Sequence, residues 1–410
     1  MLACRTRIFP RFACAKLAYR AEYSQTGYSI TLIQRSDHSL ISFCHRQAYS
    51  KEACAMKWRN IVKTGILLLL GTILTGCWDS KSIDKQLMPL VMGIDQTDNG
   101  KQYVVRLLVP HPNGGSYSIE GQAETISEAI DQMKMNQERG IGIVHVDLIL
   151  IGHTLAKAGI HDVLEFAFRT RELKSRAKLG VVKGNAADLI AQIEENQGST
   201  TRIQDFFSSH SGWDPSVALT YLWEAFRDVF SDTTDMALPY LEKGNKSIFQ
   251  VLGSAVMRDD RMTGVISSDD TLLYSAFHGH GMAGIIEVTP SASMQILSTT
   301  LDYSKEWRAG IPVLHTTLKM DCMVSATKQS GNKISTAALK KELEKLLDER
   351  YHNLFHRVQK DKCDILGTGL MFRSKLAEDQ VDRWEQEYYP KLEFDYHTVV
   401  NIRNTGDLKL

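Results

Sequence analysis

The segment Thr336–Gln359, TAALKKELEKLLDERYHNLFHRVQ, decides the fold class, because it is a long amphipathic pattern between two stretches with strand character. Its apolar residues recur every three or four positions, which places them on one helical face. They are Leu339, Leu343, Leu346, Leu347, Leu354 and Val358. A stripe of this length predicts a helix packed on a sheet. We expect Leu318–Val324 and Phe394–Ile402, where apolar and polar residues alternate, to be strands of that sheet.

Upstream of this segment, strand and helix patterns alternate. Pro89–Ile94 and Tyr103–Val109 predict a hairpin across Asp98-Asn99-Gly100, whose residues tolerate positive φ. Thr125-Ile126-Ser127-Glu128 has the spacing of a capping box. The helix expected behind it has one apolar face, formed by Ile126, Ala129, Ile130 and Met133.

The same alternation continues over the next hundred residues. Apolar strands are expected at Ile141–Ile151 and Leu179–Val182. Helical patterns begin at Leu155 and at Ile160, and two more cover Asn185–Ile193 and Val217–Phe230. Strands interleaved with helices predict an α/β-patterned N-terminal region.

The polar stretch Glu242–Lys246 marks the expected domain boundary. A second hairpin, Val251–Met257 with Met262–Ile266, follows it, and further strands are expected up to Val324. The 334 residues from Cys77 onward exceed what one hydrophobic core usually fills. We therefore predict a multi-domain α+β protein with mixed sheets packed by helices: an N-terminal region over 77–246 and a C-terminal α+β domain over 247–410.

Leu74-Thr75-Gly76-Cys77 has the form of a lipobox, a small-residue cleavage site that ends in cysteine. The apolar run Ile66–Ile73 precedes it, and Lys57, Arg59 and Lys63 supply a positive start. The apolar stretch 64–76 is shorter than the roughly 20 residues of a spanning helix. Residues 56–76 are therefore predicted to be a lipoprotein signal peptide, with Cys77 as the lipidated residue. An ordinary buried cysteine is the alternative.

Some 55 residues precede Met56, although signal peptides begin close to the start of a chain. This segment is rich in arginine and has no sustained periodicity. We expect translation to start at Met56, so that residues 1–55 are a non-native upstream extension. The alternative is an amino-terminal extension that is removed with the signal.

Charge excludes one class of partner. The whole chain is neutral, but residues 1–76 hold 11 Lys+Arg and 3 Asp+Glu, which leaves 37 and 45 in residues 77–410, a net charge of −8. Nucleic-acid binding requires a basic surface, so no nucleic-acid partner is expected. An acidic body is also repelled by anionic lipid, so membrane attachment would depend on Cys77.

Two cysteines, Cys322 and Cys363, remain after Cys77. Two are too few to indicate a disulfide framework, although pairing stays open. Cys322 alternates with apolar residues and is interpreted as a small core residue.

Motifs that superficially resemble enzyme sites are given structural interpretations. Gly279–Gly284 has glycines at dinucleotide-binding spacing but leads into a strand, whereas that site must follow a strand and open a helix. Ser325-Ala326-Thr327-Lys328 has the serine–lysine spacing of penicillin-binding enzymes but is expected in a polar loop. We therefore predict no catalytic residue and no cofactor.

The candidate histidine sites are interpreted in the same way. His278 and His280 could bind a metal, but no third ligand is near in sequence, and a solvated or hydrogen-bonded role is expected. His145 with Asp147 resembles an acid–base pair, and we expect a histidine satisfied inside a sheet. No metal site is predicted.

Several short motifs, in order, resemble the Ger(x)C family of spore germination lipoproteins. The resemblance covers the start of the predicted mature chain and its first strands, through Gly76-Cys77-Trp78-Asp79, Gly93-Ile94-Asp95, Glu124–Ala129 and His145–Gly152. It continues through Gly253–Val256, Asp259–Gly264, Asp364–Gly369, Trp384, Tyr389-Pro390 and Arg403–Gly406. Thr368 departs from the family, where an aromatic residue is more usual. The matching glycines and aspartates suit turns and caps, so no catalytic role is carried over.

The resemblance implies a non-catalytic subunit of a nutrient germinant receptor. Such a subunit is lipid-anchored at the outer face of the spore inner membrane and assembles with integral-membrane subunits; direct binding of a germinant is left open. A substrate-binding lipoprotein of an importer is the alternative, and it would have two similar lobes around a cleft. A lipid-anchored hydrolase is disfavoured by the lack of a convincing nucleophile and base.

Overall fold

The computed structural model describes residues 62–66, 85–195, 203, 206–207, 213–244, 247–328 and 335–404. Residues 1–55 and the lipobox 74–77 therefore lie outside the described residues. The chain divides into two compact units, residues 1–80 and 81–410. In the first unit, residues 62–66 are helical. Across all the described ranges, no helix is both long and apolar enough to cross a membrane.

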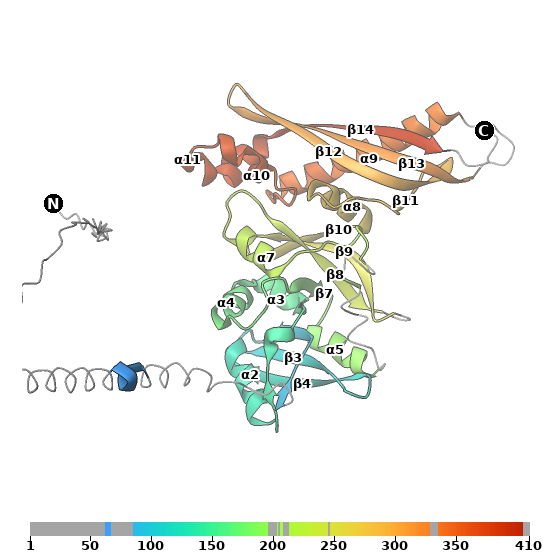
Figure 1. Cartoon of the computed structure of the whole chain (residues 1–410). Helices are drawn as coiled ribbons and strands as arrows, with labels where there is room; N and C mark the ends of the chain where they lie inside the picture. Colours follow the sequence, from blue (N-terminus) through green and yellow to red (C-terminus); the bar gives the residue numbers. More distant parts are fainter. Residues whose placement is uncertain are drawn as a thin grey trace, which may run out of the picture. The chain divides into compact units, whose positions relative to one another are not determined.

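The second unit contains a mixed eight-stranded sheet (Figure 1). Its strands lie in the order β10 (Arg261–Ile266), β9 (Phe249–Arg258), β8 (Met236–Lys243), β7 (Lys178–Val182), β6 (Leu148–Gly152), β2 (Val91–Gln96), β3 (Tyr103–Pro110) and β4 (Ser116–Ala123). The four central strands are parallel, and an antiparallel hairpin extends the sheet at each side. Both predicted hairpins, β2–β3 and β9–β10, are confirmed.

Helices cover both faces of this sheet, which explains its apolar central strands. In β6, Ile149 and Ile151 face one core and Leu148 and Leu150 face the other, so a strand buried on both sides needs no polar alternation. One core is completed by α2 (Ile126–Met135), α3 (His153–Ala158), α4 (His161–Thr170) and α7 (Leu222–Val229). The other is completed by α5 (Ala186–Glu195). All four residues predicted for the apolar face of α2 are buried.

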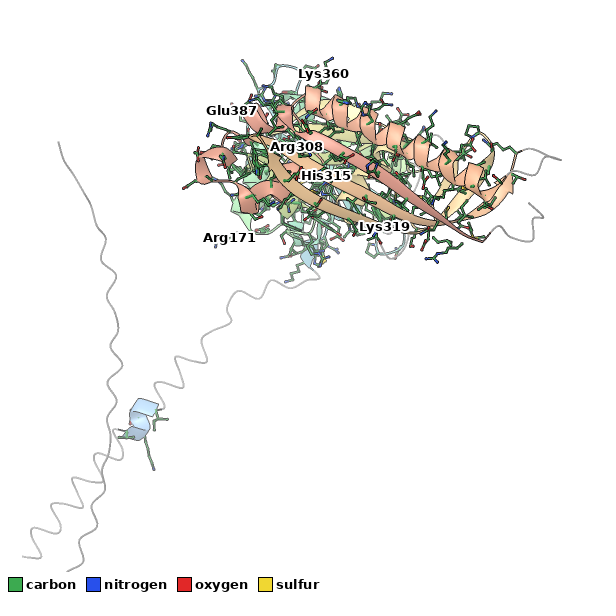
Figure 2. The ribbon with its side chains drawn as sticks, turned by 90° about the horizontal axis from the view of Figure 1, so that it is seen from above. Arg171, Arg308, His315, Lys319, Lys360 and Glu387 are labelled. Atoms are coloured by element: carbon green, nitrogen blue, oxygen red, sulfur yellow. The ribbon has the colours of Figure 1, made fainter. Side chains whose placement is uncertain are left out.

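The C-terminal half is a four-stranded sheet packed by a long helix, as predicted (Figure 2). Its order is β11 (Ile286–Val288), β12 (Ala292–Arg308), β13 (Ile311–Thr327) and β14 (Glu393–Asn404). Pairing is antiparallel except between β13 and β14, which run parallel. Helix α9 (Thr336–Lys360) lies against β14. Four short helices, α10 (Thr368–Phe372), η3 (Arg373–Lys375), α11 (Glu378–Val381) and η4 (Trp384–Tyr388), and the turn η5 (Tyr389–Lys391) connect α9 to β14.

The buried stripe of α9 differs in part from the prediction. Leu339, Leu343 and Leu347 are fully buried, but Leu346 is only partly buried at the edge of the stripe. Tyr351 and Phe355 complete the stripe and were not predicted, because only aliphatic residues were counted. The Tyr351 ring lies tilted against Tyr396 of β14, with centroids 3.7 Å apart, and the Phe355 ring stacks on Phe394 at 4.4 Å.

Three expected elements are corrected by the structure. The strand expected at 141–151 is divided into β5 (Gly140–Ile141), the turn η2 (Ile143–His145) and β6. The helix expected from Val217 begins at Leu222, because Thr220 instead accepts a hydrogen bond from Leu179 N–H and donates one to the Ala237 carbonyl. Strands were expected after β10, where helix α8 (Ser268–Phe277) lies.

Helix α8 lies between the two halves of the unit. It contacts β9 on one side and β12 and α9 on the other, and residues 271–277 are all buried. A helix that is buried all round has no polar face, so the 3.6-residue periodicity that reveals surface helices is missing. Since β9 and β10 pair with β8, the large sheet also continues across the stretch Glu242–Lys246.

Candidate functional site

The Gly93-Ile94-Asp95 motif forms a buried helix cap. The Asp95 carboxylate accepts hydrogen bonds from the backbone N–H groups of Ala186 and Ala187, each at 2.8 Å, at the start of α5. Gly152 on the neighbouring strand makes room for this carboxylate, since a Cβ there would lie 1.9 Å from Asp95 Oδ1. Burial raises the pKa of Asp95, and the two backbone hydrogen bonds oppose that shift. The motif therefore has a structural function.

The Asp364–Gly369 motif is built around a second buried carboxylate. Asp364 Oδ1 accepts from Thr368 N–H at 2.9 Å. Its Oδ2 accepts from the Thr368 hydroxyl, Gly369 N–H and Trp384 Nε1 at 2.8, 2.7 and 3.2 Å. Asp364 thus joins two motifs of the family resemblance. Thr368, which departs from the family pattern, supplies two of the four donors.

Asp235, just before β8, connects this loop to the large sheet. Its carboxylate accepts from Asp259 N–H at 3.0 Å and Asp364 N–H at 2.7 Å, and its own N–H donates to the Asp364 carbonyl. Burial raises the pKa of Asp235 to about 7, against the effect of these hydrogen bonds. Beside it, the Cys363 thiol donates to the Met257 carbonyl at 3.2 Å. These contacts form a joint between the two halves, which we call the aspartate joint: Asp235, Asp259, Cys363 and Asp364.

The motifs that resemble enzyme sites have structural contacts. Gly279–Gly284 connects α8 to β11, so it follows a helix and not the strand that a dinucleotide site requires. Ser325 lies on β13 and not in the expected loop, and Lys328 Nζ donates to the Thr289 carbonyl at 2.7 Å. Ser325 is on a strand and Lys328 lies just beyond its end, so the two residues do not share the helical turn that penicillin-binding enzymes require.

His278 has the hydrogen-bonded role that was expected. Its Nε2–H donates to the Ile365 carbonyl at 2.8 Å, and burial lowers its pKa to about 4, so the ring is neutral at pH 7. His280 instead packs edge-on against Trp213, with centroids 5.2 Å apart. Among the described residues, no three His, Cys, Asp or Glu side chains are placed to hold a metal ion.

The prediction that His145 lies inside a sheet is wrong. His145 lies in the turn η2 and is half-buried, not inside a sheet. Asp147 forms an ion pair with Lys174 at 2.7 Å. Cys322 is a buried core residue, as expected, and both Cys322 and Cys363 are free thiols in the structure.

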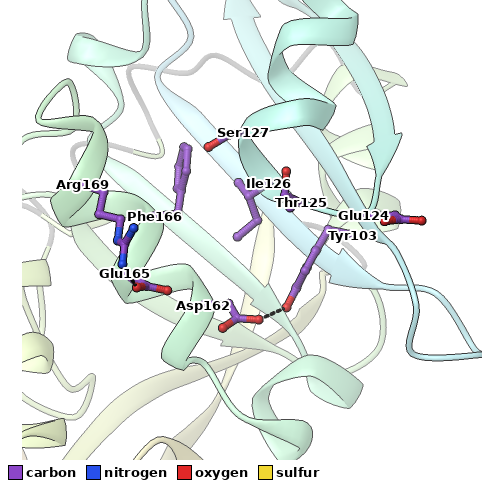
Figure 3. Close-up of a pocket in the computed structure, with 9 residues that line it drawn as sticks. All are labelled: Tyr103, Glu124, Thr125, Ile126, Ser127, Asp162, Glu165, Phe166 and Arg169. Atoms are coloured by element: carbon purple, nitrogen blue, oxygen red, sulfur yellow. Dashed lines mark hydrogen bonds and ion pairs between the residues drawn. The ribbon is translucent and has the colours of Figure 1, made fainter.

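One polar pocket was not anticipated from the sequence. It has a volume of about 310 Å³ and lies between the start of α2 and helix α4 (Figure 3). Tyr103 donates a hydrogen bond to Asp162 Oδ2 at 2.5 Å, and Arg169 pairs with Glu165 at 2.5 Å. Burial and the Asp162 carboxylate raise the pKa of Tyr103, so its phenol stays protonated. The Tyr103–Asp162 hydrogen bond joins β3 to α4. Its two residues are 59 positions apart, so no local sequence pattern reveals the contact.

The chain matches two family models in sequence order. The spore germination protein N-terminal domain matches residues 79–243, and the model described as spore germination B3/GerAC-like, C-terminal, matches residues 252–406. The C-terminal model therefore begins inside β9, within the large sheet.

Curated relatives align over most of the chain. Spore germination protein KC of Bacillus subtilis (strain 168) is 25% identical over 402 residues, covering 85% of this chain and 96% of the relative. Spore germination protein B3 of the same organism is 21% identical, covering 84% and 98%. The crystal structure of the GerBC protein matches the fold with a TM-score of 0.51 at 18% identity, over 76% of this chain and 97% of that one. The chain therefore belongs to the Ger(x)C (GerAC-like) family of spore germination proteins, the non-catalytic C-type subunits of germinant receptors.

Proposed function

We propose that this chain acts as a lipid-anchored docking subunit, held on the membrane through Cys77 and assembled there with the integral-membrane subunits of a germinant receptor. The main observation that supports this proposal is the sequence Leu74-Thr75-Gly76-Cys77, which follows a basic start and an apolar run. Two or three acyl chains hold a protein on a bilayer more firmly than one, since each buried CH₂ contributes about 0.8 kcal/mol.

Membership of a non-catalytic family supports docking as the role. The family motifs around Asp95 and Asp364 form a helix cap and part of the aspartate joint, so they stabilise the body. Because these contacts are buried, they do not occupy the surface that would contact partners. A membrane tether raises the local concentration of such partners, so modest interfaces are sufficient for assembly. We expect no hydrolytic activity and at most weak binding of germinants by residues 78–410 alone.

The importer alternative has less support. A substrate-binding lipoprotein would have two similar lobes, whereas one half here is an eight-stranded mixed sheet and the other is a four-stranded sheet with one long helix. Germinant binding by the isolated body at micromolar affinity, measured by calorimetry, would favour that alternative.

Replacing Cys77 by alanine tests the anchor. We expect Cys77→Ala to block lipid transfer and cleavage, leaving a longer precursor with weaker membrane retention, as seen by fractionation and mass spectrometry. Ser80→Ala, three residues beyond Cys77, is the matched control and should be processed like the parent. Normal cleavage and retention of Cys77→Ala would show that the lipoprotein interpretation is wrong.

A further inference from the structure

We propose that one end of the body rests on the lipid bilayer, with Met135 and Val144 in contact with the headgroup region. We call this surface the β1 end, defined by β1 (Gln86–Leu87), the C-terminus of α2, Arg139 and η2. The inference rests on the lipid anchor proposed for Cys77 and adds which surface of the body faces the membrane.

The short connection from the anchor limits where the bilayer lies. Gln86 is nine residues beyond Cys77, and a fully extended chain covers at most about 3.5 Å per residue. Whatever the conformation of this connection, β1 is within about 30 Å of the lipidated residue. Parts of the body that are far from β1 are not held to this limit.

Backbone pairing fixes which residues accompany β1. Gln86 pairs with Gly140 and Leu87 with Ile141 in parallel, and Gly142 N–H donates to the Leu87 carbonyl at 3.0 Å. Met135 at the end of α2 is five residues before this pairing, and Val144 in η2 is three residues after it. Both side chains are therefore held close to the entry point of the tether.

These two apolar side chains are exposed to solvent in the body itself. Met135 is 78% exposed, the highest value among the exposed large apolar side chains of the described residues, and Val144 is 47% exposed. Exposed apolar side chains at a surface held near lipid favour contact with the interface.

The local charge also suits a bilayer. Lys85, Lys134 and Arg139 lie in this region, against the carboxylates Asp131 and Glu138. These five side chains sum to a net charge of +1, whereas residues 77–410 as a whole carry −8, so this surface lacks the excess of acid that would repel anionic lipid. Lys134 pairs with Asp131 at 3.0 Å, whereas the exposed side chains of Lys85 and Arg139 can reach phosphate groups.

The β1 end adjoins the β4 side of the large sheet, because Gln86, Leu87 and Arg139 line one pocket with Pro110 of β3 and Tyr117 of β4, and this places the C-terminal half away from the lipid. β4 and β10 are the two edges of the large sheet, and α8 joins the β9–β10 side to β12 and α9. Figure 1 shows β4 and the C-terminal sheet at opposite ends of the second unit. Contact through the β1 end leaves the C-terminal half free for protein partners.

The test uses the lipidated protein on vesicles of phosphatidylcholine with phosphatidylglycerol. Met135→Cys is labelled with an environment-sensitive fluorophore, and Leu297→Cys on β12, also a partly exposed apolar site at 42%, is the matched control. Labelling is specific because the thioether blocks Cys77 and because Cys322 and Cys363 are buried. We expect a blue shift and quenching by lipid-borne quenchers at position 135, and neither at position 297.

Two readouts separate this inference from the proposed function. Failure of the lipidated protein to sediment with vesicles would contradict the anchor itself. Sedimentation with equal, solvent-like emission at positions 135 and 297 would leave the anchor intact and overturn the inference. A label at Val144→Cys, in η2 and not in α2, repeats the test if Met135→Cys perturbs the helix.

Discussion

At the residue scale, three buried aspartates organise backbone hydrogen bonds in the fold, and two of them, Asp95 and Asp364, lie in the family motifs. Asp95, Asp235 and Asp364 each accept two or more backbone hydrogen bonds inside the protein. A buried carboxylate without such donors would be strongly destabilising, so the glycines and loops that bring the donors close are required with it. The close approach of Gly152 to Asp95 illustrates this requirement.

Asp235 makes stability depend on pH in a predictable direction. Its pKa is about 7 in the folded state and near 3.8 when unfolded, so the folded state binds more protons between these values. The stability contributed by protonation is fully present below about pH 3.8 and is lost as the pH rises through 7. Lowering the pH from 8 to 6 should therefore increase the free energy of unfolding by about 1 kcal/mol through this group.

The variant Asp235→Asn isolates the contribution of Asp235 to the pH dependence of stability. Asp228 and His278 also titrate, but they do so in the parent and in the variant alike. We expect the variant to be less stable than the parent, with a deficit about 1 kcal/mol larger at pH 6 than at pH 8. Denaturant unfolding of both proteins at the two pH values measures it. A deficit independent of pH would mean that Asp235 stays ionised in the folded protein.

At the element scale, the amphipathic stripe of α9 is the feature on which the C-terminal core depends. Leu339, Leu343 and Leu347 belong to the same buried cluster as Leu318, Met320 and Cys322 of β13. Tyr351 adds a polar contact, since its hydroxyl donates to the Leu273 carbonyl of α8 at 3.0 Å. Helix α9 therefore contacts both the sheet and α8.

Shortening a side chain of α9 should lower the stability strongly at the centre of the buried stripe and very little on the polar face of the helix. Leu347→Ala leaves a cavity at a fully buried site and is expected to cost about 2 to 5 kcal/mol. Leu346→Ala should cost less, because its side chain is only partly buried. Lys345→Ala, which loses only an exposed ion pair with Glu349, should be nearly silent. Thermal melts rank the three variants; equal midpoints would show that the stripe is not a core face.

At the scale of the whole molecule, the two halves are joined by more than one contact. β9 and β10 extend the large sheet beyond residue 246, α8 lies between the two sheets, and the aspartate joint links β8 to the Asp364 loop. The two family models meet between residues 243 and 252, where no break in the sheet occurs. We therefore expect cooperative unfolding of the second unit.

Shortened chains test this coupling. A chain of residues 78–246 lacks β9 and β10, which leaves the apolar strand β8 as an unpaired edge, so we expect it to aggregate or remain unfolded. A chain of residues 78–266 keeps the whole sheet and serves as the matched comparison, with more native secondary structure by circular dichroism. A stable, cooperatively melting 78–246 fragment would show that the N-terminal region folds alone.

The sequence by itself determined the local elements whose pattern is strong. The α2 face, both hairpins, α5 and α9 followed from apolar periodicity and turn residues, because side chains on the surface of a sheet or helix alternate with solvent. The family was also recognisable, since the order of short motifs survives where each motif alone is unspecific. The lipobox lies outside the described residues and remains a prediction from sequence.

Only the tertiary structure decided features that depend on distant segments. Residues 271–277 of helix α8 are all buried, so the helix shows no periodicity. Thr220 and Tyr221, inside the expected 217–230 helix, pair with β7 instead. Asp235 and Asp364 are 129 residues apart, and Tyr103 and Asp162 are 59 residues apart. No local sequence pattern can therefore predict either contact. The β1 end likewise exists only because β1 pairs with β5 across the fold. Periodicity reports whether a side chain faces solvent or core, whereas the partners of a buried polar group are set by the packing of the whole chain.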